Sequence, residues 1–151
     1  MSVVPISLEV DGVQHGWANM SIHAGEQNLR MQGFSYVTDA FDDLVRLGVN
    51  VALDCRRMEI IFDGEPAGWM WRFEGDDSRS WLSVFDVRDA NHPDSEKTLA
   101  LNVEVNRDQF AASILSAMTK LRSELGEDGF EGAWMAPFPR QGMLALQAVL
   151  S

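Results

Sequence analysis

The sequence predicts an α+β protein with a mainly antiparallel sheet of six to seven strands, packed on one face by two main helices and a short C-terminal helix. Three observations indicate this class. Apolar residues alternate with polar ones over several short stretches, as in half-buried strands. Two other stretches repeat apolar residues at helical spacing. Turn signals such as Asp11-Gly12 and Gly25 separate the strand-like stretches, as expected for a mainly antiparallel meander. No repeat or linker divides the 151 residues, so residues 1–151 are expected to form a single domain.

The period-2 stretches define the expected strands. The first of them contains Pro5, which has no amide donor. This strand is therefore expected at an edge of the sheet, unless Pro5 belongs to the first residues before pairing starts. Such an edge can pair with a second copy, and only Pro5 and Glu9 oppose this pairing, so monomer and homodimer both stay open. The expected strands cover 4–10, 17–23, 29–36, 58–62, 69–73, 81–87 and 99–105.

The stretch FDGEPAGWMWRF predicts a hairpin with a strongly fixed register. Folding it about the DGEPAG loop gives the pairs Phe62 with Trp69, Ile60 with Trp71 and Met58 with Phe73. All six side chains then point to one side of the sheet, and a slip of one residue would turn them toward water. We therefore interpret the tryptophans as core residues. Glu65, at the loop tip and held extended by the following proline, is interpreted as a carboxylate that is solvated or bonded to local amides, and not as a catalytic residue.

Capping residues and apolar spacing predict the helices. The first is expected to begin at Thr38 or Asp39 and to end at Gly48 or near Leu53. The second is expected over 107–125, with Gly126 ending it in the left-handed conformation. After it, Phe130, Trp134 and Phe138 are expected to hold a loop against the body, and Pro139 is expected in the first turn of the C-terminal helix.

The charge balance excludes some classes of partner. The chain has 23 acidic and 12 basic residues, a net charge of −11, and no basic cluster beyond Arg56–Arg57. Nucleic acids and anionic membranes are therefore not expected as partners, whereas a basic protein is compatible with the charge. Cys55 is the single cysteine, and neither a secretory signal nor a transmembrane helix is recognisable, so a cytoplasmic location is expected.

No motif in the sequence carries a recognisable chemistry. His15, His23, His92 and Cys55 do not follow metal-ligand spacing, and neither a nucleophile elbow nor a glycine-rich phosphate loop is present. We therefore expect no catalytic residue, no metal and no cofactor. Residues distant in the sequence can still assemble an active site, so the question of an enzyme stays open.

Acidic residues are the remaining candidates for a site. Asp39, Asp42 and Asp43 cluster at the start of the first helix, and Asp76 and Asp77 lie at a hairpin end. These five residues are candidates for docking a basic protein. The other interpretation is a solvated surface in which the helix acids cap the helix and complement its dipole.

The segments SYVTDAFDDL, FDGEPAGWMWRF and LGEDGFEGAWMAPFP together resemble a pattern of small, acidic, uncharacterised bacterial proteins. The pattern is an F-x-x-EP hairpin with W-x-W/F and a C-terminal G-[FY]…W…PFP segment. Similar proteins resemble immunity proteins of bacterial toxin systems, which implies a non-enzymatic protein-binding domain. The alternative is a small ligand-binding domain or enzyme with a pocket between sheet and helices, lined by Trp17, Trp69, Trp71 or Trp81.

Overall fold

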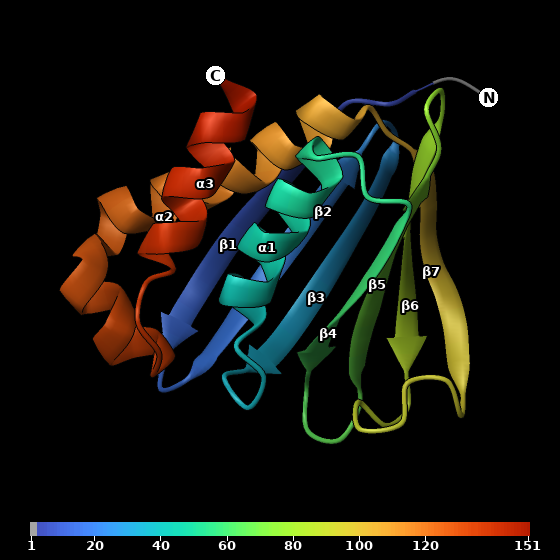
Figure 1. Cartoon of the computed structure of the whole chain (residues 1–151). Helices are drawn as coiled ribbons and strands as arrows, with labels where there is room; N and C mark the ends of the chain where they lie inside the picture. The colour runs from blue at the N-terminus through green and yellow to red at the C-terminus, as the bar shows by residue number, and fades with distance from the viewer. Residues whose placement is uncertain (1–2) are drawn as a thin grey trace.

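The computed structural model describes residues 3–151, which form seven strands and three helices (Figure 1). In chain order these are β1 (Ile6–Gln14), β2 (Trp17–Ala24), β3 (Gln27–Ser35), α1 (Ala40–Ala52), β4 (Arg57–Asp63), β5 (Gly68–Gly75), β6 (Ser80–Val87), β7 (Lys97–Glu104), α2 (Arg107–Trp134) and α3 (Arg140–Leu150). The helices gather on one side of β1–β3, and β5–β7 lie at the right of the view (Figure 1). The predicted α+β class is therefore confirmed.

The strands form two antiparallel sheets, so the expectation of one sheet of six to seven strands is wrong. The first sheet has the order β1-β2-β3 and the second the order β4-β5-β6-β7. The break falls where α1 separates β3 from β4. Because the chain returns along α1, β3 and β4 run in the same direction side by side (Figure 1) and share no ladder. This is the connection between consecutive strands that contains a helix, and these two strands do not pair.

The β4–β5 hairpin has the predicted register. Met58 pairs with Phe73, Ile60 with Trp71 and Phe62 with Trp69. Phe62, Trp71 and Phe73 are fully buried, whereas Met58 and Trp69 are partly buried. The apolar alternation and the loop length were sufficient to fix this pairing.

The tip of this hairpin corrects one expectation. Glu65 is exposed as expected, but its φ of 54° lies in the left-handed region, so the residue is not extended. Two short bonds close the loop around it: the amide of Gly64 donates to the carbonyl of Ala67, and the amide of Glu65 donates to Oδ1 of Asp63 at 2.8 Å. These local bonds outweigh the preference for extended backbone before proline.

Helix α1 begins after Asp39 and continues through Gly48 to Ala52. The glycine lies inside the helix because another helix packs closely on it. A Cβ atom at Gly48 would lie 3.3 Å from the side chain of Leu146 in α3. Gly48 therefore marks a helix–helix contact and not a helix end.

Helix α2 is longer than predicted, because the chain forms helix again after Gly126. Gly126 has positive φ (72°) as expected, but its ψ of 164° kinks the helix, which then continues to Trp134. Phe130 and Trp134 are thus buried residues of a helix, not of a loop, and only Phe138 lies in the connection to α3. The sequence favoured a stop because glycine with positive φ usually ends a helix.

One aromatic cluster joins the two sheets to the helices. The ring of Phe34 in β3 lies 5.0 Å from that of Phe62 in β4, 5.6 Å from that of Phe41 in α1 and 5.8 Å from that of Trp134 in α2. All four side chains are fully buried. Within residues 3–151, no helix combines the length and the hydropathy needed to cross a membrane.

Candidate functional site

The tryptophans mostly fill the core. Trp71 and Trp134 are fully buried, and the indole N–H of Trp71 points to the sulfur of Met31 at 3.2 Å. Trp69 and Trp81 are half-buried, and Trp17 is exposed. Five surface hollows are described for residues 3–151, and no tryptophan lines any of them. The structure therefore gives no support to a tryptophan-lined pocket.

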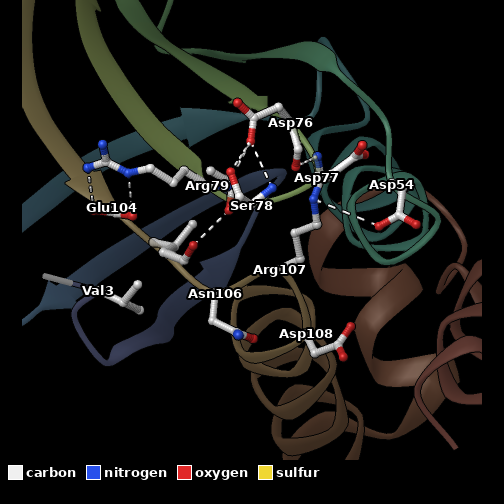
Figure 2. Close-up of a pocket in the computed structure, with 12 residues that line it drawn as sticks. Val3, Asp54, Asp76, Asp77, Ser78, Arg79, Glu104, Asn106, Arg107 and Asp108 are labelled. Carbon is white, nitrogen blue, oxygen red and sulfur yellow. Dashed lines mark hydrogen bonds and ion pairs between the residues drawn. The ribbon is translucent and has the colours of Figure 1, made fainter.

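A polar hollow of about 230 Å³ lies where the C-terminal end of α1, the β5–β6 turn and the start of α2 meet (Figure 2). Five carboxylates and two arginines are among its lining residues. The charged residues are Asp54, Asp76, Asp77, Asp108, Glu104, Arg79 and Arg107.

Both arginines of the polar hollow are already engaged by the fold. Arg79 donates two bonds to the buried carboxylate of Glu104, at 3.1 and 3.0 Å, and holds the pKa of that carboxyl below its usual value. Arg107 donates to the carbonyl of Val51 at 3.1 Å and lies over the ring of Phe73. These bonds to protein atoms give both guanidinium groups a structural role, in which they connect the β5–β6 turn to β7 and the start of α2 to the end of α1.

Asp76 and Asp77, which the sequence indicated, both lie at this hollow but differ in role. The carboxylate of Asp76 accepts bonds from the amides of Arg79 and Ser78, both at 2.8 Å, and these lower its pKa. It therefore shapes the β5–β6 turn. Asp77 is almost fully exposed and lies 3.7 Å from Arg56.

Asp39, Asp42 and Asp43 lie at the opposite end of α1. The helix has 13 residues, so at 1.5 Å per residue its ends are roughly 20 Å apart. The structure therefore does not bring the two groups of candidate acids together. Asp39 is also part of the fold, because its Oδ1 accepts a bond from the indole N–H of Trp134 at 3.1 Å.

Exposed apolar side chains gather next to Asp39. The amide of Gly16, in the β1–β2 turn, donates to the carbonyl of Ala133 at 2.9 Å, and the amide of Tyr36 donates to the carbonyl of Gly16 at 2.9 Å. These bonds bring the β1–β2 turn, the end of β3 and the end of α2 to one place. We call the resulting surface the terminal apolar patch. Its members are Trp17 (38% exposed), Tyr36 (46%), Val37 (58%) and Met135 (56%).

Gly16 allows this convergence because no other residue would fit. Its φ is 78°, and a Cβ atom at this position would lie 2.5 Å from the ring of Tyr36 and 3.2 Å from the side chain of Met135. His15 and Met135 also have positive φ, at 54° and 78°. Non-glycine residues in this conformation are uncommon, and strained backbone is often found at functional sites.

Sequence reasoning missed most of this patch. It placed Trp17 and Tyr36 in strands without noting their exposure, and it treated Met135 as part of a loop. The available signal was the run Tyr36-Val37 between a strand and a helix cap, where two apolar residues have no second element to pack against. The contact with Met135, almost a hundred residues away, left no local pattern.

The histidines and the cysteine do not form a catalytic group. His15 lies in the β1–β2 turn beside the terminal apolar patch. His23 lies beside Asn28 and Glu9 on exposed strand positions. The part of the chain from residue 3 onward contains no group of three or more His, Cys, Asp or Glu residues suited to hold a metal ion. Burial raises the pKa of the Cys55 thiol, only partly opposed by Arg107, so the thiol is protonated and weakly nucleophilic at neutral pH.

Comparisons of this chain with protein-family models, with curated proteins and with solved structures find no match.

Proposed function

We propose that this chain is a non-enzymatic protein-binding domain, and that its partner docks on the terminal apolar patch and on the acidic residues at the start of α1. The observation that carries the proposal is the exposure of Tyr36, Val37 and Met135 directly beside Asp39. The patch and the helix start are linked through adjacent residues, since Asp39 binds the indole of Trp134, the residue before Met135.

The composition of the patch is that of a binding hot spot. Tryptophan, tyrosine and methionine are enriched at protein interfaces, and tryptophan and tyrosine dominate the residues whose truncation costs most. The chain has one tyrosine and five tryptophans. Its tyrosine and its most exposed indole thus lie at the same end of the molecule, where they would be covered by a partner.

The acidic border defines the charge of that partner. Asp42 lies 3.9 Å from Arg46, which is the one cation in ion-pair contact with Asp39, Asp42 or Asp43 among residues 3–151. Burial and the neighbouring Asp42 and Asp39 raise the pKa of Asp43, so negative charge is in excess here. A lysine or arginine of the partner would relieve this repulsion. The expected ligand is a protein surface with apolar side chains flanked by cations.

An immunity-like role is the form of this function that the sequence resemblance favours. An immunity protein binds one toxin tightly and blocks it, which requires an apolar anchor for affinity and charge complementarity for rapid association. The neighbouring gene in the source genome provides the direct test. A basic protein encoded there that is toxic when expressed alone, and harmless when expressed with this chain, would support the role.

The test of the binding surface compares two double variants, each of which truncates two exposed side chains to alanine. Tyr36→Ala/Met135→Ala truncates two members of the patch, and Leu99→Ala/Leu144→Ala truncates two exposed apolar side chains of β7 and α3 outside it. A partner captured by the wild-type chain is then titrated against both variants by calorimetry. Hot-spot truncations cost about 2 kcal/mol each, so we expect the patch variant to bind at least roughly 100-fold more weakly. Equal binding by the two variants would contradict the proposal.

A further inference from the structure

One edge of the first sheet has unpaired backbone groups. Among residues 3–151, strand β1 pairs with β2 alone. The amide of Gly25 donates to the carbonyl of Pro5 at 3.0 Å, and Ile6 lies opposite Ala24. In an antiparallel ladder this pattern directs the N–H and C=O groups of Ser7 and Glu9 toward β2. Those of Ile6, Leu8 and Val10 point away from the sheet.

Over residues 3–151, the amides of Ile6, Leu8 and Val10 make no hydrogen bond to another part of the chain. The preceding outward amide, that of Val4, does have a partner, the carbonyl of Glu104 at the end of β7, at 3.1 Å. The protein therefore pairs the outer side of this segment at one end only. From Ile6 onward the edge has the donors and acceptors that an added strand requires.

A groove runs beside this edge. Two hollows, of about 420 and 560 Å³, follow the flank of α2 and share Ala112 and Ser116. The first is walled by Pro5–Leu8 on one side and by α2 on the other, where three of the four lining side chains are small and the fourth is Gln109. Small residues on a helix flank let another backbone or helix approach closely. The flank residues are Gln109, Ala112, Ser113, Leu115, Ser116, Thr119, Lys120, Ser123 and Glu124.

The groove is electrically neutral in a strongly acidic protein. Lys120 and Glu124 are its charged members, and they have opposite signs, whereas the chain carries a net charge of −11. A cationic partner would be drawn to the carboxylates elsewhere. By contrast, a second copy of this chain would be repelled from the acidic surfaces and least repelled at this groove.

We propose that the groove is occupied by a second copy of the same chain, with the two β1 strands pairing antiparallel about a two-fold axis. With Leu8 opposite its own copy, Ile6 lies opposite Val10 and Ser7 lies opposite Glu9. No two like charges face each other in this register, and Leu8 forms a hydrogen-bonded pair with its counterpart. The two three-stranded sheets become one sheet of six strands, with the small-residue flanks of the two α2 helices facing across the axis.

The two residues that oppose edge pairing in the sequence do not obstruct it in the structure. Pro5 has the same parity as Ser7, so its missing N–H would face β2 and not the open edge. The carboxylate of Glu9 lies 3.8 Å from the ring of His23, which belongs to β2. Neither residue therefore removes a donor from the outer side of the strand.

The experiment measures the molecular mass of the chain in solution and the hydrogen exchange of its β1 amides. It uses the chain alone, so its outcome does not depend on the proposed binding function. Ala112→Glu/Ser116→Glu adds two charges to exposed positions of the groove, and Ala145→Glu/Ala148→Glu adds the same charges to exposed positions of α3. In sedimentation velocity, the wild-type chain and the α3 variant are expected at twice the mass of 16.9 kDa, and the groove variant at the monomer mass.

Hydrogen exchange then identifies the contact. The amides of Ile6, Leu8 and Val10 are expected to exchange slowly in the dimer and at least tenfold faster in the groove variant. As a control, the far-ultraviolet circular dichroism spectrum of the groove variant should match that of the wild-type chain, which would show that the variant is folded. A monomeric wild-type chain at millimolar concentration would overturn the proposal. A dimer that survives in the groove variant, or one in which these three amides exchange rapidly, would overturn it as well.

Discussion

At the scale of single residues, Asp39 has two structural roles. Its Oδ1 accepts a bond from the amide of Asp42 at 3.5 Å, which caps α1, and one from the indole N–H of Trp134 at 3.1 Å. Trp134 is fully buried, so its N–H would lose its acceptor if the carboxylate were removed. Asp39 therefore holds the end of α2 against the start of α1, and the proposed binding surface depends on it indirectly.

This double role predicts a difference between two substitutions. Asp39→Ala should lower the free energy of unfolding by about 1–3 kcal/mol, since it removes a helix cap and leaves a buried donor unpaired. Asp39→Asn keeps an acceptor oxygen in place and should cost less than about 1 kcal/mol. Urea unfolding followed by tryptophan fluorescence measures both values. If the two variants lose the same stability, charge and not hydrogen bonding is what matters at Asp39.

Asp43 predicts a dependence on pH. Burial and the neighbouring carboxylates raise its pKa above 3.8 in the folded chain. The unfolded chain thus releases this proton first as the pH rises, so the contribution of Asp43 to stability falls between pH 3.8 and its folded pKa. Asp43→Asn has no proton to release. Its stability relative to wild type should therefore be higher at pH 7 than below pH 3.8, as measured by urea unfolding at both values. A relative gain that appears only in acid would contradict the raised pKa.

At the scale of elements, glycine has two different roles within α2. Gly126 has φ 72° and ψ 164°, a conformation that is almost exclusive to glycine, and it bends the helix so that Phe130 and Trp134 reach the core. Gly132 lies in regular helix, and a Cβ atom there would meet no atom within 4 Å. The kink is therefore set by one residue, whereas the second glycine only lowers the stability of the helix.

The two positions form a matched test. Gly126→Ala should lower the free energy of unfolding by about 1–3 kcal/mol, because alanine is strained in that conformation. Gly132→Ala should raise it by about 0.5–1 kcal/mol, because alanine loses less entropy in a helix. Chemical denaturation of both variants provides the comparison. A gain in stability at both positions would mean that the two helical segments can straighten into one.

The elements also show how far local pattern determines the fold. The register of the β4–β5 hairpin was predictable because its apolar alternation and its loop lie within sixteen residues. For the same reason the helix cap was predictable to within one residue, as Thr38 or Asp39, and the structure has Asp39. The division into two sheets, the bond from Trp134 to Asp39 and the meeting of Tyr36 with Met135 depend on contacts between distant segments. Period and capping patterns describe neighbours in sequence and carry no information about these contacts.

At the scale of the whole molecule, charge and contact make separable contributions to binding. The net charge of −11 would attract a cationic partner from a distance, whereas the terminal apolar patch and the start of α1 are the proposed contact. Long-range attraction acts on the association rate, and contacts that are broken on release act mainly on the dissociation rate. The two groups of acids at opposite ends of α1 allow the contributions to be distinguished.

Two variants of equal charge test this separation. Asp42→Asn/Asp43→Asn removes two charges at the proposed contact, and Asp77→Asn/Asp108→Asn removes two exposed charges at the polar hollow, roughly 20 Å away. Both variants should associate more slowly than the wild type at low salt, and this difference from the wild type should shrink as salt is added. The Asp42→Asn/Asp43→Asn variant alone should also dissociate faster, because each exposed ion pair lost with the partner weakens binding by about 0.2–1 kcal/mol. Surface plasmon resonance with the captured partner measures both rates. If the polar-hollow variant dissociates faster and the α1 variant does not, the partner sits at the polar hollow, and the end of the molecule bearing Tyr36 is not the binding surface.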